Sequence, residues 1–159
     1  MQQVSSRYLT LAKQISALLD RDLPYISNLA NFSALLWMEL EHINWVGCYL
    51  INQSNDTLLL GPFQGKPACS SIVVGKGVCG EAFAKQSSIC VPDVHQFPGH
   101  IACDGASASE IVVPFHLNGR LIGVIDIDSP QLSRFDDSDQ IGIEYLVKEL
   151  ENNLSEVHF

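Results

Sequence analysis

A two-residue turn signal between two apolar runs constrains the fold of this chain most strongly. The runs are EIVVPFHL at positions 110–117 and RLIGVIDID at positions 120–128, and Asn118-Gly119 separates them. Asn-Gly suits a tight turn in which both residues have positive φ, and such a turn joins antiparallel strands. The sequence therefore predicts a β-hairpin within an antiparallel sheet.

Helical patterns stand at both ends of the chain. Apolar residues recur three and four positions apart in residues 8–20 and 23–40, and a third helix is predicted over residues 133–154. Short apolar runs predict further strands at residues 44–51, 58–63, 70–74 and 88–93. We expect one α+β domain over residues 1–159, with a helical N-terminal segment over about residues 1–42. Its N- and C-terminal helices pack on one face of a central, mainly antiparallel sheet, which leaves the other face for a pocket.

The balance of charge limits the classes of partner. Among 159 residues, 18 Asp and Glu stand against 9 Lys and Arg, which gives a formal net charge of −9. Nucleic acids and anionic lipids are polyanions that such a chain repels, so neither is expected as a partner. The N-terminal residues lack the basic and apolar regions of a signal peptide, and no apolar run is long enough to span a bilayer. These features predict a soluble, cytoplasmic protein.

The cysteines divide into two groups. None belongs to a C-x-x-C pair, and the five are Cys48, Cys69, Cys79, Cys90 and Cys103. Cys48 and Cys90 fall in predicted strands and are expected to be core thiols. The other three lie beside glycine, proline or small polar residues, where a thiol can be reactive. Cys79 is expected to gain thiolate character from a helix N-terminus, and Cys103 lies in a long loop over residues 94–109 that is typical of a lid.

A glycine pattern offers one alternative function. Gly75, Gly77 and Gly80 fit the G-x-G-x-x-G pattern of dinucleotide-binding folds. That pattern works only in a βαβ unit with a long crossover helix. Here the following helix has room for barely two turns, so a tight structural turn is the preferred interpretation.

A zinc site is a second alternative. Its four ligand types follow the spacing C-x4-H-x4-H-x2-C and are Cys90, His95, His100 and Cys103. Structural zinc sites usually present a close pair such as C-x2-C, and this pattern has none. Loop histidines that cap backbone groups are the simpler interpretation.

Three carboxylates are candidates for one cluster. Asp126 and Asp128 stand two apart on a predicted strand, so their side chains project from the same face. The simplest hairpin register places Glu110 opposite Ile127, on the wrong face. A one-residue bulge corrects this, and Pro114, which cannot donate to a ladder, is a reasonable place for it. We predict that Glu110 joins the two aspartates, with a surface position as the alternative.

Four longer motifs point to a known family. They are GPFQGKPAC at 61–69, GKGVCG at 75–80, VPDVHQFPGHIACDGASASEIVVP at 91–114 and GVIDIDSP at 123–130. These segments closely resemble those of the free methionine-(R)-sulfoxide reductases, small enzymes built on a GAF domain. The resemblance runs from about Asn44 to the closing helix and implies a single GAF domain. It also implies reduction of the R epimer of free methionine sulfoxide with thiols, no metal and no bound cofactor.

The resemblance assigns the redox chemistry to three cysteines. Cys103 would be the nucleophile that attacks the sulfoxide sulfur and becomes a sulfenic acid. Cys69 would resolve it by forming a disulfide, and Cys79 would be a third cysteine able to assist. Thioredoxin would restore the dithiol, with NADPH as the indirect source of electrons.

The resemblance also implies a substrate pocket closed by the loop around Cys103, which a peptide chain could not thread. The carboxyl groups would protonate the sulfoxide oxygen and balance the ammonium group, and an aromatic wall would enclose the methyl group. These residues are Glu110, Asp126 and Asp128, with Asp93 assisting, and Trp45 and Tyr49 as the wall. Cys48 stands where relatives are expected to have an aromatic residue, which predicts a looser wall behind Trp45.

A GAF-type sensor that binds a ligand without turnover is the main rival to the enzyme. The terminal helices offer a possible homodimer interface.

Overall fold

A six-stranded antiparallel sheet forms the centre of the molecule. The computed structural model describes residues 2–101 and 103–158. The strand order is β3-β2-β1-β6-β5-β4, and each hydrogen-bonded pair of neighbours is antiparallel. The strands are β1 (Trp45–Asn52), β2 (Thr57–Gly65), β3 (Ser71–Val73), β4 (Ile89–Val91), β5 (Ser109–Leu117) and β6 (Arg120–Ser129). The predicted sheet is confirmed, and within the described residues no parallel βαβ unit supports the dinucleotide alternative.

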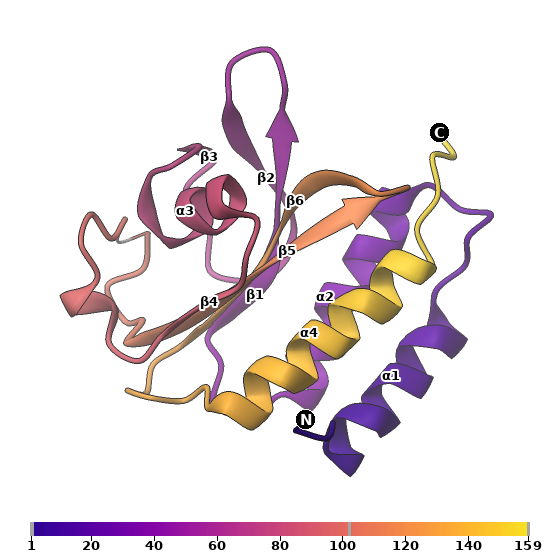
Figure 1. Cartoon of the computed structure of the whole chain (residues 1–159), viewed down its shortest axis with the longest axis horizontal. Coiled ribbons are helices and arrows are strands. Elements are labelled where there is room, and N and C mark those ends of the chain that lie inside the picture. Colours follow the sequence, from indigo (N-terminus) through magenta and orange to yellow (C-terminus); the bar gives the residue numbers. More distant parts are fainter. Residues whose placement is uncertain (1, 102, 159) are drawn as a thin grey trace.

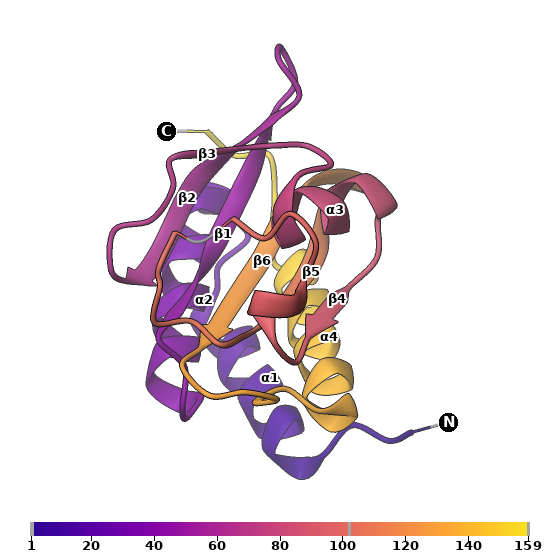
Figure 2. The same cartoon turned by 90° about the vertical axis from the view of Figure 1, so that its left-hand side faces the viewer.

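The helices lie on both faces of the sheet, but unequally. The long helices α1 (Ser6–Leu18), α2 (Tyr25–Glu39) and α4 (Asp137–Asn152) cover one face, as predicted (Figure 1). The short helix α3 (Gly77–Lys85) lies on the other face. The loop between β4 and β5, which contains the 3-10 helix η1 (Val94–Gln96), runs over that same face (Figure 2). The predicted pocket face is therefore covered by α3 and this loop.

An apolar core lies on each face of the sheet. The larger one joins the three long helices to the sheet and contains Phe32, Phe115 and Leu146, all fully buried. The smaller core lies under α3 and contains Val112 and Val124. Because side chains alternate along a strand, the side chain of Asp126, two residues after Val124, points to the α3 side as well.

The β5–β6 hairpin has the predicted turn. Asn118 and Gly119 have φ values of 51° and 78°. A bulge is also present, but not at Pro114, which pairs in register with Val124. Phe115 pairs with Gly123 and His116 with Leu121, so Ile122 is the extra residue. Pro114 needs no bulge, because β4 pairs with β5 only as far as Val112. On the β4 side of Pro114, no hydrogen bond of that pairing requires the backbone N–H that proline lacks.

In residues 2–101 and 103–158, no helix combines the length and the apolar composition needed to cross a bilayer.

We predict that Gly142→Ala destabilises the fold, because α1 crosses α4 at this glycine. A Cβ at position 142 would lie 2.1 Å from Cδ2 of Tyr8, so α1 would have to move. The expected loss in the free energy of unfolding is about 1–3 kcal/mol, measured by denaturant titration. Ser138→Ala, on the exposed side of the same helix, is the control and should change it by less than about 0.5 kcal/mol. Stabilisation by Gly142→Ala, as in an open helix, would contradict this packing.

Candidate active site

A cavity lies between the sheet, α3 and the β4–β5 loop. Its volume is about 50 Å³. The structure brings seven of the predicted site residues to its walls: Trp45, Tyr49, Cys79, Cys103, Glu110, Asp126 and Asp128. These residues come from β1, α3, the β4–β5 loop, β5 and β6, so the cavity exists only in the folded sheet.

A disulfide joins Cys69 and Cys103 beside this cavity. Their Cα atoms lie 5.6 Å apart although 34 positions separate them in the sequence. Cys69 belongs to the β2–β3 connection and Cys103 to the β4–β5 loop. Cys103 is exposed and Cys69 is half-buried. The bond therefore ties two loops together at the rim and not in the interior.

The carboxyl groups gather as predicted. Glu110 pairs with Asp128 across β5 and β6, and Asp126 lies two residues away on β6. Glu110 is 5% exposed and Asp126 is 6% exposed. The bulge at Ile122 provides the register shift that places Glu110 on the aspartate face, which the simple two-residue turn alone does not.

Burial raises the pKa of each of these acids. Desolvation, with a smaller effect of the Asp128 charge, raises the pKa of Glu110 to about 8. Desolvation, followed by the charge of Glu110, raises the pKa of Asp126 well above its usual range. Desolvation and then the charge of Asp126 do the same for the pKa of Asp128. At neutral pH the cluster holds protons that it can donate.

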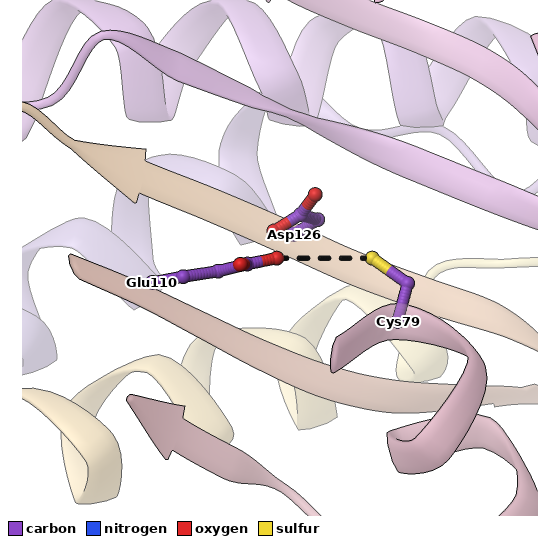
Figure 3. A group of neighbouring side chains, drawn as sticks. All are labelled: Cys79, Glu110 and Asp126. Atoms are coloured by element: carbon purple, nitrogen blue, oxygen red, sulfur yellow. Dashed lines mark hydrogen bonds between the residues drawn. The ribbon is translucent and has the colours of Figure 1, made fainter. Parts of the chain in front are cut away.

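Cys79 lies inside this cluster. Its Sγ lies 4.0 Å from Oε1 of Glu110 and the side chain is buried (Figure 3). Burial first, and then the charges of Asp126 and Glu110, raise the pKa of the Cys79 thiol well above its usual value. The expectation of an activated thiolate at a helix N-terminus is wrong for Cys79, because burial and three carboxyl groups outweigh the end of one short helix.

Two aromatic residues wall the cavity and also fix one of its loops. The rings of Trp45 and Tyr49 stack with centroids 6.0 Å apart. Nε1 of Trp45 donates a hydrogen bond to the carbonyl oxygen of Lys66 (3.1 Å), and the Tyr49 hydroxyl donates to that of Cys69 (2.9 Å). Both bonds hold the segment that carries the disulfide.

Cys48 takes no part in this wall. It is fully buried in the larger core, on the helix side of the sheet. The expected loosening of the wall behind Trp45 is therefore wrong, since residues 45 and 49 face one side of β1 and residue 48 faces the other. The second predicted core thiol, Cys90, is half-buried, with its Sγ 3.3 Å from the carbonyl oxygen of Phe135.

Asp93 lies away from the cavity walls. Its carboxylate accepts from the backbone N–H of His95 (3.0 Å) and contacts Nδ1 of the same residue (2.8 Å). These hydrogen bonds lower the pKa of Asp93. The expectation that Asp93 assists in the pocket is not met, because its position before η1 makes it the cap of that helix.

The four-residue zinc pattern is not assembled. Cys103 is in the disulfide, Cys90 contacts Phe135, and His95 contacts Asp93. His100 has a different position: it lines the cavity, with Nε2 at 3.6 Å from Oε2 of Glu110. Burial lowers its pKa.

Sequence reasoning did not assign His100, Lys66 or Ser107 to the pocket, although all three line it. For His100 a signal was present, since it stands three residues before Cys103. Lys66 lies in the motif that ends at Cys69, and Ser107 lies in the motif over residues 91–114, so both had a comparable signal.

Comparisons with known proteins agree on one family. The GAF domain family matches residues 34–154. A protein of Escherichia coli (strain K12) named free methionine-R-sulfoxide reductase is 49% identical over 148 residues, which cover 93% of this chain and 88% of that protein. A structure of fRMsr of Staphylococcus aureus in its reduced form has a TM-score of 0.88 at 49% identity, covering 96% of this chain and 99% of that chain. A free methionine-R-sulfoxide reductase from Neisseria meningitidis in complex with its substrate has a TM-score of 0.88 at 41% identity, covering 96% and 92%.

The raised pKa of Glu110 predicts how stability depends on pH. Its folded-state pKa is about 8 and its ordinary value is 4.5, so between these values the folded protein holds more protons than the unfolded chain. The free energy of unfolding therefore falls as pH rises through this window, by up to about 1.4 kcal/mol per pH unit for each such group. Glu110→Gln should reduce that slope by up to this amount, measured by denaturant titration of the oxidised protein at several pH values.

The exposed Glu144 on α4 provides the control for this measurement. Glu144→Gln is expected to keep the slope of the unchanged protein. Equal slopes for the unchanged protein and Glu110→Gln would contradict the buried, protonated state of Glu110.

Proposed function

The chain belongs to the GAF-domain family of free methionine-(R)-sulfoxide reductases, and from this premise we propose that it reduces free methionine-(R)-sulfoxide to methionine with Cys103 as the nucleophile. The observation that carries the proposal is the Cys69–Cys103 disulfide beside a cavity with buried carboxyl groups and an aromatic wall. A disulfide in this position is the product expected from one turnover.

The first chemical step takes place at the rim of the cavity. The Cys103 thiolate attacks the sulfoxide sulfur, the oxygen passes to the Cys103 sulfur, and methionine leaves. The enzyme then holds a sulfenic acid at Cys103. The thiol of Cys69 attacks this sulfur, water leaves, and the disulfide forms.

The buried acids supply the proton and the counter-charge for this step. Glu110, with a pKa of about 8, is protonated at neutral pH and can donate to the sulfoxide oxygen. Asp126 and Asp128 then bind the ammonium group of the amino acid, because its positive charge favours the ionised form of both carboxyl groups. The stacked rings of Trp45 and Tyr49 give the methyl group an apolar surface.

The enzyme regains its thiols by exchange with thioredoxin. Two electrons pass from the thioredoxin dithiol to the Cys69–Cys103 bond, and NADPH supplies them through thioredoxin reductase. Exposure of Cys103 supports this step, because an incoming thiolate needs access to a sulfur. No bound cofactor is required for this sequence, and a cytoplasmic location would provide the reductant.

We predict that the purified protein consumes only the R epimer of free methionine sulfoxide. The protein is incubated with both epimers, thioredoxin, thioredoxin reductase and NADPH, and chiral chromatography follows each epimer and methionine. Loss of the R epimer with an equal gain of methionine is the expected result. Binding without methionine formation, in a mixture shown to reduce another disulfide, would favour a GAF sensor instead.

Two cysteine variants separate the roles of the sulfurs. Cys103→Ser should lose activity by at least about a thousandfold, because the attacking sulfur is gone. Cys69→Ser should still form about one equivalent of methionine per enzyme before turnover stalls, unless Cys79 resolves in its place. Quenched samples assayed for methionine per enzyme measure both. Steady-state turnover in Cys103→Ser would reject the assignment of the nucleophile, and Cys90→Ser, which changes a thiol outside the cavity, is the control.

A further inference from the structure

Cys79, Glu110 and Asp126 form a compact group of donor atoms that the proposed reaction does not fully explain. A sulfur and two carboxyl oxygens, one from each residue, all lie within 4.8 Å of one another, and all three residues are buried (Figure 3). The reaction needs acids at this place, but it does not need a buried thiol beside them. The group is therefore also a candidate site for a metal ion.

The donor types favour zinc over other common divalent cations. Thiolate sulfur selects Zn²⁺, whereas Mg²⁺ and Ca²⁺ prefer sites made only of oxygen. With Zn–S near about 2.3 Å and Zn–O near about 2.0–2.2 Å, tetrahedral ligands stand roughly 3.5 Å apart. The 4.0 Å between Sγ of Cys79 and Oε1 of Glu110 needs only a small contraction to reach this value.

An unsatisfied atom gives independent evidence for a missing partner. Oδ1 of Asp126 is buried and has no hydrogen-bond partner among the described residues. The residue is 6% exposed, so water has little access to it. A buried polar atom without a partner costs roughly 1–3 kcal/mol, and a bound cation would remove that cost.

His100 and Asp128 complete the surroundings. Nε2 of His100 lies 3.6 Å from Oε2 of Glu110, beside the three donor residues but outside the group whose atoms lie within 4.8 Å of one another. Asp128 pairs with Glu110 across the strands and adds a further acid beside the group. The formal net charge of −9 attracts cations to the protein as a whole.

We propose that Cys79, Glu110 and Asp126 bind one Zn²⁺ ion that inhibits the enzyme by excluding its substrate. Zinc displaces the thiol proton of Cys79 and the carboxyl protons of Glu110 and Asp126, and these protons leave to solvent as the three bonds to the ion form. The ion takes the carboxyl groups that would otherwise meet the ammonium group and the sulfoxide oxygen. The inhibitory part rests on the proposed function, whereas the binding part does not.

Cobalt titration of the oxidised protein tests the site without any turnover. The disulfide occupies the sulfurs of Cys69 and Cys103, so among the described residues Cys79 is the one thiol on the cavity walls that remains free in this form. Co²⁺ replaces Zn²⁺ as the probe because a thiolate–cobalt bond gives a near-ultraviolet charge-transfer absorption. We expect saturation of this absorption at one equivalent and its loss when Zn²⁺ is added.

Matched variants locate the absorption. Cys79→Ser should abolish it and weaken Zn²⁺ binding at least about tenfold, as calorimetry measures, whereas Cys90→Ser should change neither. Far-ultraviolet circular dichroism checks that each variant is folded. No absorption in the unchanged protein, or an absorption that survives in Cys79→Ser, would overturn the site.

A single-turnover assay tests the inhibition. Reduced enzyme freed of small thiols is mixed with one equivalent of Zn²⁺ and then with methionine-(R)-sulfoxide, and methionine is compared with a zinc-free sample of the same variant. The unchanged enzyme should lose most of its product, and in Cys79→Ser the zinc concentration for half inhibition should rise at least about tenfold. Equal inhibition in both would place the effect at Cys69 and Cys103 and overturn the proposal. If no methionine forms without zinc, the proposed function fails, and the cobalt titration still decides the metal site.

Discussion

The burial of two carboxyl groups and a thiol, beside a third carboxyl group that is half-buried, is the constraint on which the site depends. Moving a charged carboxylate out of water carries a penalty of several kcal/mol, so a buried acid keeps its proton unless a cation compensates. The raised pKa values of Glu110, Asp126 and Asp128 express this penalty. The opposite face of the sheet supplies the compensating stability, because three long helices bury a large apolar core against it. The face under the three long helices thus stabilises the fold, and the face under α3 carries the acid cluster.

The composition of the acid cluster depends on one residue of register. In a hairpin without a bulge, Glu110 would face the helices, where an acid would have no polar partner, and the cavity would hold only Asp126 and Asp128. The extra residue at Ile122 turns Glu110 to the cavity. Gly123 follows it, and a Cβ there would lie 2.2 Å from the carbonyl oxygen of Tyr49, so the neighbouring strand fits only against glycine. Turn, bulge and glycine together determine which acids meet.

Local signals in the sequence predicted most of the fold and part of the site. The Asn118-Gly119 turn and the helical spacing depend on neighbours in the chain, so a single sequence is enough to recognise them. The roles of Cys69 and Cys103 came from the resemblance of long motifs. The environment of Cys79 could not be predicted in the same way, because its pKa depends on residues 31 and 47 positions away, on β5 and β6. The bulge was predicted from the need to move Glu110, but its position at Pro114 was wrong: Pro114 pairs in register with Val124, and the extra residue is Ile122.

In the proposed reaction, the position of the disulfide separates thiol–disulfide exchange from proton transfer. Acids that must stay protonated at neutral pH need a dry interior, whereas a sulfur that exchanges with another protein needs access to the surface. In this fold Glu110 is buried on an interior strand, β5, and Cys103 is exposed on a loop that reaches the same cavity. Tyr49 connects the two regions, since it lines the cavity and also holds the carbonyl of Cys69. A reductant can therefore reach the disulfide through Cys103 without opening the acid cluster to water.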